Sequence, residues 1–182
     1  MTAPKFSSAQ YLATDHPRTL FPLDATRVLV EQCEDHLTEY IYKHILSEED
    51  ETAQFLPQQR CYAAKHDFFL RRTVKLDPVA EFFLYDIVYR NRKAFRPDHR
   101  ANRRSFGYRF AGGIPESPAR AYGEFKRAVF DAWQTHDGTV STDVATYFTA
   151  IYHHDLVACV ERIDWPDTDA AALGKFLRQI NS

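Results

Sequence analysis

Asp143 lies in a sequence context that suits a catalytic metal ligand. Residues 139–143 alternate as a short strand does, and a helix is predicted to begin near His153. A carboxylate at the end of a strand is held rigidly and can bridge two magnesium ions near a reacting phosphate. The next residue, Val144, can offer its backbone carbonyl to one metal, and an aromatic residue a few positions later can lie under the sugar of a nucleotide. The pattern therefore indicates two-metal phosphoryl transfer.

The run of residues 143–156, DVATYFTAIYHHDL, resembles the first metal-binding motif of the reverse-transcriptase palm. That motif has an Asp, an aliphatic residue, two variable positions and a pair of aromatic residues, followed by Ile and by a His before a Leu. Members from retrons, group II introns and bacterial defence systems share it. The resemblance implies that Asp143 is a magnesium ligand, that Val144 is a backbone ligand, and that Phe148 excludes ribonucleotides by clashing with the 2′-hydroxyl. The alternative is that Asp143 only caps the turn that follows it and that the aromatic residues belong to the core.

The segment before this motif is strongly basic. Between residues 90 and 110 a single acid, Asp98, accompanies eight basic residues: Arg90, Arg92, Lys93, Arg96, Arg100, Arg103, Arg104 and Arg109. Aromatic residues are interleaved with these, and strand alternation would place Phe106, Tyr108 and Phe110 on one face. Arginines bind phosphates and aromatic rings support bases, so Arg104 and Arg109 are candidates for contact with a nucleotide or a template. The alternative is a solvated basic face packed against acidic helices.

Reverse transcriptases also place basic residues on paired fingers strands ahead of the palm, and the order here is similar. Residues 76–78 and 89–92 are most similar to the bacterial antiviral and abortive-infection branch of the family. The resemblance therefore implies template-directed DNA synthesis, with an RNA template, a DNA product, deoxynucleoside triphosphates as substrates and Mg²⁺ as cofactor. It also implies a role in phage defence.

The acidic hairpin that completes a palm, in which an aromatic residue precedes a pair of Asp residues, does not follow Asp143. Asp155, Asp164, Asp167 and Asp169 fall in helix or turn contexts instead. The chain is therefore interpreted as the N-terminal part of a longer polymerase, or else as a degenerate stand-alone relative. One carboxylate cannot hold both metal ions, so these 182 residues alone are expected not to polymerise.

The elements that must position these residues form an α+β arrangement that is predominantly helical. Helices are predicted from Asp24, as N-cap, to the acidic run at 47–51, at 59–72, at 117–134, at 153–162 and at 169–180, the last capped by Asp167 or Thr168. Residues 79–89 fit either a buried helix or a strand, residues 1–23 form an irregular arm, and Gly112-Gly113 and residues 136–138 form turns. Three regions are expected: an N-terminal arm and helix (1–58), a basic fingers-like region (59–136) and the start of the palm (137–182).

Apolar spacing also predicts which helix faces are buried. The first helix is expected to bury Val28, Leu29, Cys33, Leu37, Tyr40, Ile41 and Ile45. The second is expected to bury Tyr62, Phe68, Phe69 and Leu70. These side chains recur at three- and four-residue steps or cluster on one side of the predicted helix.

The composition is that of a globular cytoplasmic protein. Of 182 residues, 45% are hydrophobic and 26% are charged, so a packed core is expected and wholesale disorder is not. The net charge of -2 argues neither for nor against nucleic acid. Cys33, Cys61 and Cys159 support neither a zinc ribbon nor a disulfide framework and indicate reduced, mostly buried thiols. The sequence shows no signal peptide and no apolar run long enough for a bilayer, so membrane contact is not expected, while the oligomeric state stays open.

Two other classes of function remain open. Residues 136–137 (HD) and 153–155 (HHD) are similar to the ligands of metal-dependent phosphohydrolases, in which imidazoles and carboxylates from several helices hold a divalent metal. His66 would supply the upstream histidine, although such a cluster at a helix start more often leaves exposed imidazoles. A non-catalytic RNA-binding module would need only the basic segment, with Arg103, Arg104 and Arg109. Neither a nucleophile elbow nor a GxxxxGK phosphate loop is found.

Overall fold

The computed structural model describes residues 6–47, 52–64, 69–95, 105–107, 109–142, 151–163 and 165–181. In these ranges the fold is mostly helical with two small antiparallel sheets, which confirms the predicted α+β class. The helices are α1 (Ser8–Asp15), α2 (Asp24–Tyr40), α3 (Pro78–Arg90), α4 (Pro118–Trp133), α6 (His153–Arg162) and α7 (Asp167–Ile180), with the short turns η1 (His16–Arg18), η2 (Ile41–Ile45) and η4 (Arg92–Ala94). The strands are β1 (Gln59–Ala64), β2 (Leu70–Lys75), β3 (Phe110–Ala111) and β4 (Ile114–Pro115).

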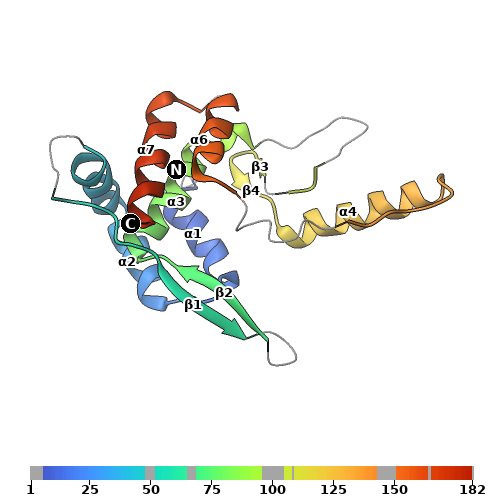
Figure 1. The fold of residues 1–182 in the computed structure, drawn as a ribbon, viewed down its shortest axis with the longest axis horizontal. Coiled ribbons are helices and arrows are strands. Elements are labelled where there is room, and N and C mark those ends of the chain that lie inside the picture. Colours follow the sequence, from blue (N-terminus) through green and yellow to red (C-terminus); the bar gives the residue numbers. More distant parts are fainter. Residues whose placement is uncertain are drawn as a thin grey trace, which may run out of the picture.

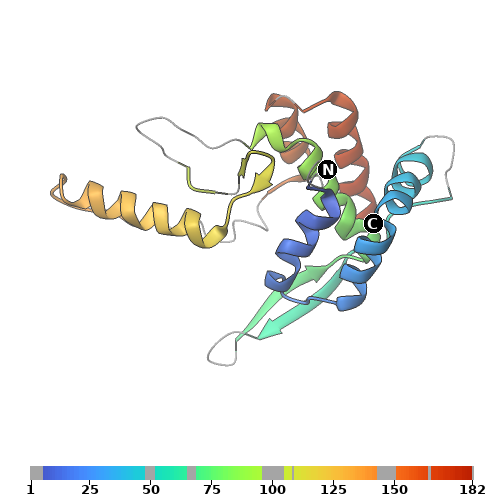
Figure 2. The same ribbon diagram turned by 180° about the vertical axis from the view of Figure 1, so that it is seen from behind.

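Helices α1, α2, α3 and α7 form the helical body, with α3 at its centre (Figures 1 and 2). Its core joins aromatic rings from distant parts of the chain. The ring centroid of Phe83 in α3 lies 5.0 Å from that of Phe55 and 5.1 Å from that of Phe176 in α7. All three side chains are buried, and burying a side chain of this kind contributes about 1.5–3 kcal/mol. The core therefore combines residues from each of the three regions expected along the chain, and Val160 of α6 also belongs to it.

Residues 8–18 are helical, so the prediction of an irregular arm over residues 1–23 is wrong there. A capping box begins α1: Ser7 Oγ accepts a hydrogen bond from Gln10 N (3.3 Å), and Gln10 Oε1 accepts one from Ser7 N (3.1 Å). Tyr11 and Leu12 are buried, and the helix packs on α2 and α3. A helix this short is stabilised by its contacts with α2 and α3 rather than by its own propensity, and its sequence shows no long apolar stripe.

Helix α2 begins at Asp24 as predicted, but Leu23 rather than Asp24 occupies the N-cap position. Its buried side, continued through the π-helical turn η2, consists of Thr26, Val30, Leu37, Ile41 and Ile45. The predicted stripe is only partly correct, because the following members are exposed: Val28, Leu29 and Tyr40. Cys33 has a non-helical backbone (φ -127°, ψ 23°), and the π turn adds a second departure from regular geometry. A fixed period of 3.6 residues therefore does not follow the buried side.

The helix predicted over residues 59–72 is wrong, because the chain there forms the antiparallel hairpin of β1 and β2. Cys61 pairs with Thr73, and both are half-buried, while Tyr62 pairs with Arg72 and both are exposed. This period of two is that of a strand. The apolar residues that suggested a helix do not face a core: Tyr62, Phe69 and Leu70 are all more than 60% exposed. Phe68 lies outside the described residues.

Helix α3 settles the ambiguity of residues 79–89 in favour of a helix. Asp77 is its N-cap, and Oδ1 of Asp77 accepts hydrogen bonds from the backbone N–H groups of Val79 (2.9 Å) and Ala80 (3.3 Å). Pro78 occupies the first turn, a position that suits proline because its missing N–H would have no partner within the helix. The helix is apolar around most of its circumference, which is typical of a helix surrounded by others.

The turn predicted at Gly112-Gly113 joins β3 to β4. Both glycines have positive φ angles, 60° and 83°, which is the conformation that a two-residue hairpin turn of type I′ requires. The hairpin is followed by α4, which begins at Pro118 as predicted and ends at Trp133. Helix α4 projects away from the helical body (Figures 1 and 2).

The chain after α4 bends at residues 136–137, as predicted, and continues through residues 139–142 without forming the predicted strand. Helix α6 begins at His153 and ends at Arg162, which confirms its predicted range. Helix α7 begins at Asp167 with Pro166 at the N-cap position, so the predicted caps Asp167 and Thr168 are wrong. Asp167 instead lies in the first turn, where its carboxylate favours the positive end of the helix dipole.

The three cysteines are free thiols, as expected, but they are less buried than predicted. Cys33 and Cys61 are half-buried and Cys159 is exposed. Among the residues that the structure describes, none of the helices combines the length and the apolar character needed to cross a membrane.

Candidate functional site

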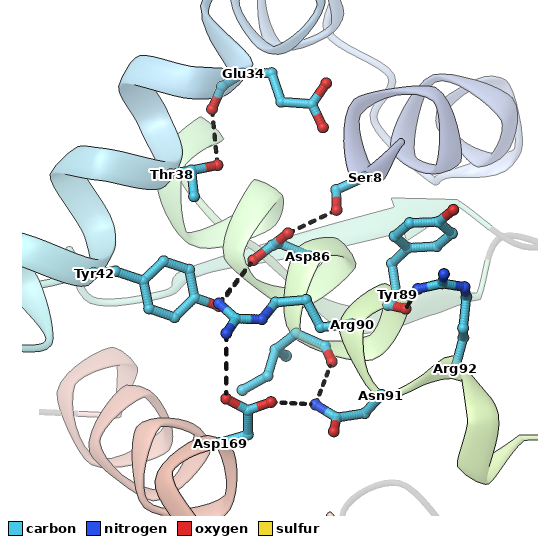
Figure 3. A network of polar contacts seen from close by, with 11 residues as sticks. Ser8, Glu34, Thr38, Tyr42, Asp86, Tyr89, Arg90, Asn91, Arg92 and Asp169 are labelled. Carbon is cyan, nitrogen blue, oxygen red and sulfur yellow. Dashed lines mark hydrogen bonds and ion pairs between the residues drawn. The ribbon is translucent and has the colours of Figure 1, made fainter. Parts of the chain in front are cut away.

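Asp86 of α3 lies at the centre of a buried polar network inside the helical body (Figure 3). The hydroxyl of Ser8 in α1 donates to Oδ1 of Asp86 at 2.6 Å. The hydroxyl of Tyr42 in η2 donates to Oδ2 at 2.8 Å. Arg90, one turn further along α3, places Nη1 4.0 Å from the same oxygen. One carboxylate therefore joins α1, η2 and α3.

Asp169 of α7 is the second carboxylate of this network (Figure 3). Nδ2 of Asn91 donates to Oδ2 of Asp169 at 2.7 Å and to the backbone oxygen of Ile87 at 2.9 Å. Nη2 of Arg90 lies 3.8 Å from Oδ1 of Asp169. The guanidinium carbon of Arg90 also lies 4.4 Å above the ring centroid of Tyr42, which is a cation–π arrangement. Arg90 thus bridges the two carboxylates and covers Tyr42.

The network raises the pKa values of Tyr42 and Arg90. Burial, and then the charge of Asp86, raise the pKa of Tyr42 above its usual range, so the phenol remains a hydrogen-bond donor. Burial acts to lower the pKa of Arg90, but Tyr42, Asp169 and Asp86 together raise it. The donors and acceptors satisfy one another inside the protein, which is typical of a network that holds helices in place. We therefore assign these residues a structural role.

Arg109 forms a different kind of site at the foot of α4. Phe110 pairs with Pro115 in the β3–β4 hairpin, and the ladder continues one step outward, where the backbone N–H of Glu116 donates to the backbone oxygen of Arg109 at 3.0 Å. This register places the two side chains together, and Nε of Arg109 donates to Oε2 of Glu116. From the second turn of α4, Oε2 of Glu124 accepts a hydrogen bond from Nη2 of Arg109 at 2.7 Å.

The guanidinium of Arg109 is buried, with its side chain only 6% exposed. Its third nitrogen, Nη1, is also buried and has no hydrogen-bond partner in the described structure. Partial burial acts to raise the pKa of Glu124, but hydrogen bonds from Arg109 and Arg120 outweigh it and lower this pKa below its usual value. Glu124 therefore stays ionised, and two carboxylates neutralise the charge of Arg109.

A cleft of about 260 Å³ opens beside this cluster. It is lined by Phe106, Gly107, Arg109, Glu116, Pro118, Ala121, Tyr122 and Phe125. The rings of Tyr122 and Phe125 are stacked with centroids 6.2 Å apart, and Phe106 meets Phe125 edge-on at 5.7 Å. We call this feature the Arg109 cleft. Aromatic rings form one side of the cleft, and its charged lining residues are Arg109 and Glu116.

The predicted metal and nucleotide residues lie mostly outside the described part of the chain. Asp143, Val144, Phe148 and Arg104 belong to residues 96–104 and 143–150, so their expected roles stay predictions. Arg109 is the one of these candidates that the structure describes. Its guanidinium is buried and ion-paired, whereas a residue that binds template phosphates is expected to present an accessible charge.

The predicted single face for the aromatic residues of the basic segment is wrong. Phe110 packs into a small cluster with Tyr11 and Tyr89, while Phe106 contacts Phe125 of α4. The described strand spans only Phe110 and Ala111, so the alternation expected for a longer strand does not apply. Tyr108 lies outside the described residues.

The histidines considered as phosphohydrolase ligands are separated in the structure. The Nδ1 atom of His136 lies 2.8 Å from the backbone oxygen of Ala132, at the end of α4. Nε2 of His153, at the start of α6, lies 3.3 Å from Nδ2 of Asn181. Within the described ranges, no three side chains of the His, Cys, Asp and Glu types come together as a metal-binding group. His66 lies outside these ranges.

The sequence analysis did not predict the polar network of Asp86 and Asp169 or the carboxylates that pair with Arg109. Nothing local in the sequence joins Asp86 to Ser8 or Asn91 to Asp169, because these contacts span 78 residues each. Glu116, by contrast, has a usable signal. A two-residue turn at Gly112-Gly113 places positions 109 and 116 opposite each other, so the ion pair follows from the turn type. Glu124 depends on how α4 leaves the hairpin and has no such signal.

Comparisons of the chain with protein-family models, with curated proteins and with solved structures gave no match.

Proposed function

We propose that this chain is the N-terminal part of a reverse transcriptase-like protein. In its full-length form this protein synthesises DNA on an RNA template by two-metal nucleotidyl transfer, in the cytoplasm and in the service of phage defence. The run of residues 143–156 carries the proposal, because its order of acidic, aliphatic, aromatic and histidine positions is similar to the palm motif over fourteen positions. The start of α6 at His153 supports it, since the motif passes into a helix at that point.

The proposed roles divide between the motif and the basic segment. Asp143 binds Mg²⁺ through its carboxylate and Val144 binds it through its carbonyl, while Phe148 excludes ribonucleotides. A carboxylate pair from the palm hairpin of the full-length protein completes the two-metal site. Arg104 contacts the template or the incoming nucleotide. Arg109 joins the β3–β4 hairpin to α4 through Glu116 and Glu124, so it positions these elements and is assigned no role in the metal site.

The test is DNA synthesis by the full-length protein with an Asp143→Asn substitution. The amide keeps the size of the side chain but is a much weaker Mg²⁺ ligand, so we expect incorporation of labelled deoxynucleotides on an RNA template to fall to background. Asp155→Asn is the matched control, because Asp155 is exposed in the first turn of α6 and has no proposed role in the metal site.

Synthesis that survives Asp143→Asn contradicts the motif assignment. A protein that releases phosphate from nucleotides and loses this activity in Asp155→Asn, but not in Asp143→Asn, would be a phosphohydrolase. RNA binding without synthesis, abolished by charge reversal at Arg103 and Arg104, would identify a non-catalytic RNA-binding module.

A further inference from the structure

We propose that the Arg109 cleft binds a nucleobase of a single-stranded nucleic acid, and specifically one that carries a carbonyl next to a ring N–H, as guanine and uracil do. The choice of a nucleobase among flat ligands rests on the proposed function. The argument for a flat ligand with a carbonyl and a ring N–H does not depend on that function, because it comes from the residues that line the cleft. It lies outside the motif at residues 143–156, so it is a binding site in addition to the proposed metal site.

The unpaired nitrogen of Arg109 supplies the first argument. A guanidinium has five N–H donors in a fixed planar arrangement. Glu116 and Glu124 engage Nε and Nη2, and Nη1 is left buried without a partner in the described structure. A buried donor without an acceptor is costly and uncommon in native proteins. A ligand carbonyl that enters the cleft with a small adjustment of the side chain supplies the missing acceptor.

Glu116 supplies the second argument. Its Oε2 atom receives the hydrogen bond from Arg109, while Oε1 has no part in that bond and the residue lines the cleft. A carboxylate oxygen accepts hydrogen bonds and donates none when ionised. A ligand N–H that faces Glu116 next to a carbonyl that faces Arg109 therefore matches both side chains. Guanine and uracil have this pair of groups on one edge, and adenine and cytosine do not.

The aromatic wall supplies the third argument. Bases stack on aromatic side chains, and such stacking is a common source of affinity for single strands. Tyr122 is 60% exposed and Phe125 is 44% exposed, and their rings lie 26° from parallel. Both residues line the cleft, so the uncovered parts of their rings are accessible to a base that enters it. Few soluble proteins leave rings of this size uncovered on one side of a helix without a partner for them.

Size and charge restrict the ligand further. The volume of about 260 Å³ lies below the roughly 300–1,000 Å³ of pockets that hold drug-sized ligands, so the cleft suits one ring system and leaves sugar and phosphate outside. Lys126 lies 4.9 Å from the ring centroid of Tyr122, and Arg120 pairs with Glu124 at 3.2 Å. These two cations on α4 stand near the cleft, where a phosphate attached to the bound base can reach them.

The experiment uses the 182-residue chain with the four nucleosides, which lack phosphate and so report base recognition alone. Saturation-transfer NMR is expected to show at least about a threefold stronger signal for guanosine and uridine than for adenosine and cytidine. Tyr122→Ala should abolish the signal by removing the exposed ring. Phe130→Ala is the matched control, because Phe130 is 57% exposed on the same helix and does not line the cleft.

A second measurement uses fluorescence anisotropy with single-stranded oligonucleotides of uridine and of cytidine. Uridine oligonucleotides should bind at least about threefold more tightly, and Tyr122→Ala should remove this difference. Equal signals from all four nucleosides, or no signal from any, overturn the proposal. So does a signal that Phe130→Ala reduces as strongly as Tyr122→Ala, or a dimer that both substitutions dissociate, since the aromatic face would then be a contact between copies.

These outcomes are independent of the proposed polymerase. A full-length protein that loses DNA synthesis in Asp143→Asn but shows no preference among nucleosides retains the proposed function and refutes only the base-binding cleft. A preference for guanosine and uridine without any DNA synthesis retains the cleft and refutes the polymerase.

Discussion

Helices α3 and α4 have similar aromatic content and opposite surroundings. Helix α3 carries Phe82 and Phe83, which are fully buried between α1, α2 and α7. Helix α4 carries Phe130 and Trp133, which are 57% and 61% exposed, and it projects from the body. The first helix is apolar around its axis, and the second has one apolar side facing solvent. An apolar pattern therefore indicates which residues favour burial but leaves open what buries them.

The polar residues beside the two helices differ in the same way. Around α3, Asp86 and Asp169 accept hydrogen bonds or ion pairs from four neighbouring side chains, and these contacts close within the protein. Beside α4, Arg109 is paired on two sides and left with an unpartnered nitrogen on the third. A closed network fixes structure, whereas the unpaired nitrogen of Arg109 leaves a donor that a ligand in the adjacent cleft can satisfy.

The largest expected difference between the two helices is in stability. Phe83→Ala removes a ring that contacts Phe55 and Phe176 in the core, and we expect it to lower the free energy of unfolding by about 3–5 kcal/mol. Phe130→Ala on α4 should change it by less than about 0.5 kcal/mol, because the ring is exposed. Urea unfolding followed by circular dichroism measures both.

Similar losses for the two substitutions would mean that the face of α4 is covered in solution. In that event the stability of the protein should also depend on its concentration, as expected for association between copies.

A smaller effect is expected for Tyr42→Phe in the polar network. Removing the hydroxyl deprives Asp86 of one donor, and we expect a loss of about 1–2 kcal/mol at neutral pH. The effect should also depend on pH. Burial and Asp86 raise the pKa of Tyr42 in the folded protein above its value of about 10 in the unfolded chain. The Tyr42 hydroxyl therefore contributes fully to the free energy of unfolding below about pH 10, and its contribution decreases as the pH rises further.

Urea midpoints at pH values of about 8 and about 10.5 test this expectation. The wild-type protein should lose more stability between the two values than Tyr42→Phe does, since the variant no longer has this titrating group. Parallel losses in both proteins would show that Tyr42 does not link folding to pH.

The smallest effect is expected for the substitution Gly123→Ala, in the middle of α4. A Cβ atom at this position meets nothing within 4 Å, and alanine favours a helix over glycine by about 0.5–1 kcal/mol. Because α4 stands apart from the body, we expect slower amide hydrogen exchange in α4 and little change in the urea midpoint. A midpoint that rises by the full amount would show that α4 unfolds together with the body.

The elements predicted correctly from the sequence are those with local signals at their ends. Pro118 marks the start of α4, and the glycine pair marks the turn between β3 and β4. Asp77 and Pro78 mark the start of α3, although residues 79–89 by themselves also fitted a strand. Each of these signals acts within a few residues. The resulting fold class and most of the helix ranges follow from them.

The elements that were missed depend on contacts with distant residues. The β1–β2 hairpin carries exposed Tyr62 and Leu70, so its apolar residues give a false helical pattern. Helix α1 is stabilised by packing on α2 and α3. The sequence of α1 alone gives little sign of this packing. At the candidate site, Arg109 is recognisable as an arginine among aromatic residues, but its burial depends on Glu124 from another element. Register and packing decided these outcomes, and neither is a property of a short sequence window.

The contacts of α7 bear on how the protein is made. Phe176 completes the aromatic core around Phe55, and the backbone N–H of Gln58 donates to the backbone oxygen of Ile180 at 2.9 Å. A ribosome delivers these residues of α7 only after Phe55 and α3 have already emerged. The nascent chain must therefore hold an unfinished apolar surface until residues 167–180 leave the exit tunnel, and such surfaces are prone to aggregate. Synthesis speed over this stretch, and chaperones that shield it, should govern the yield of folded protein.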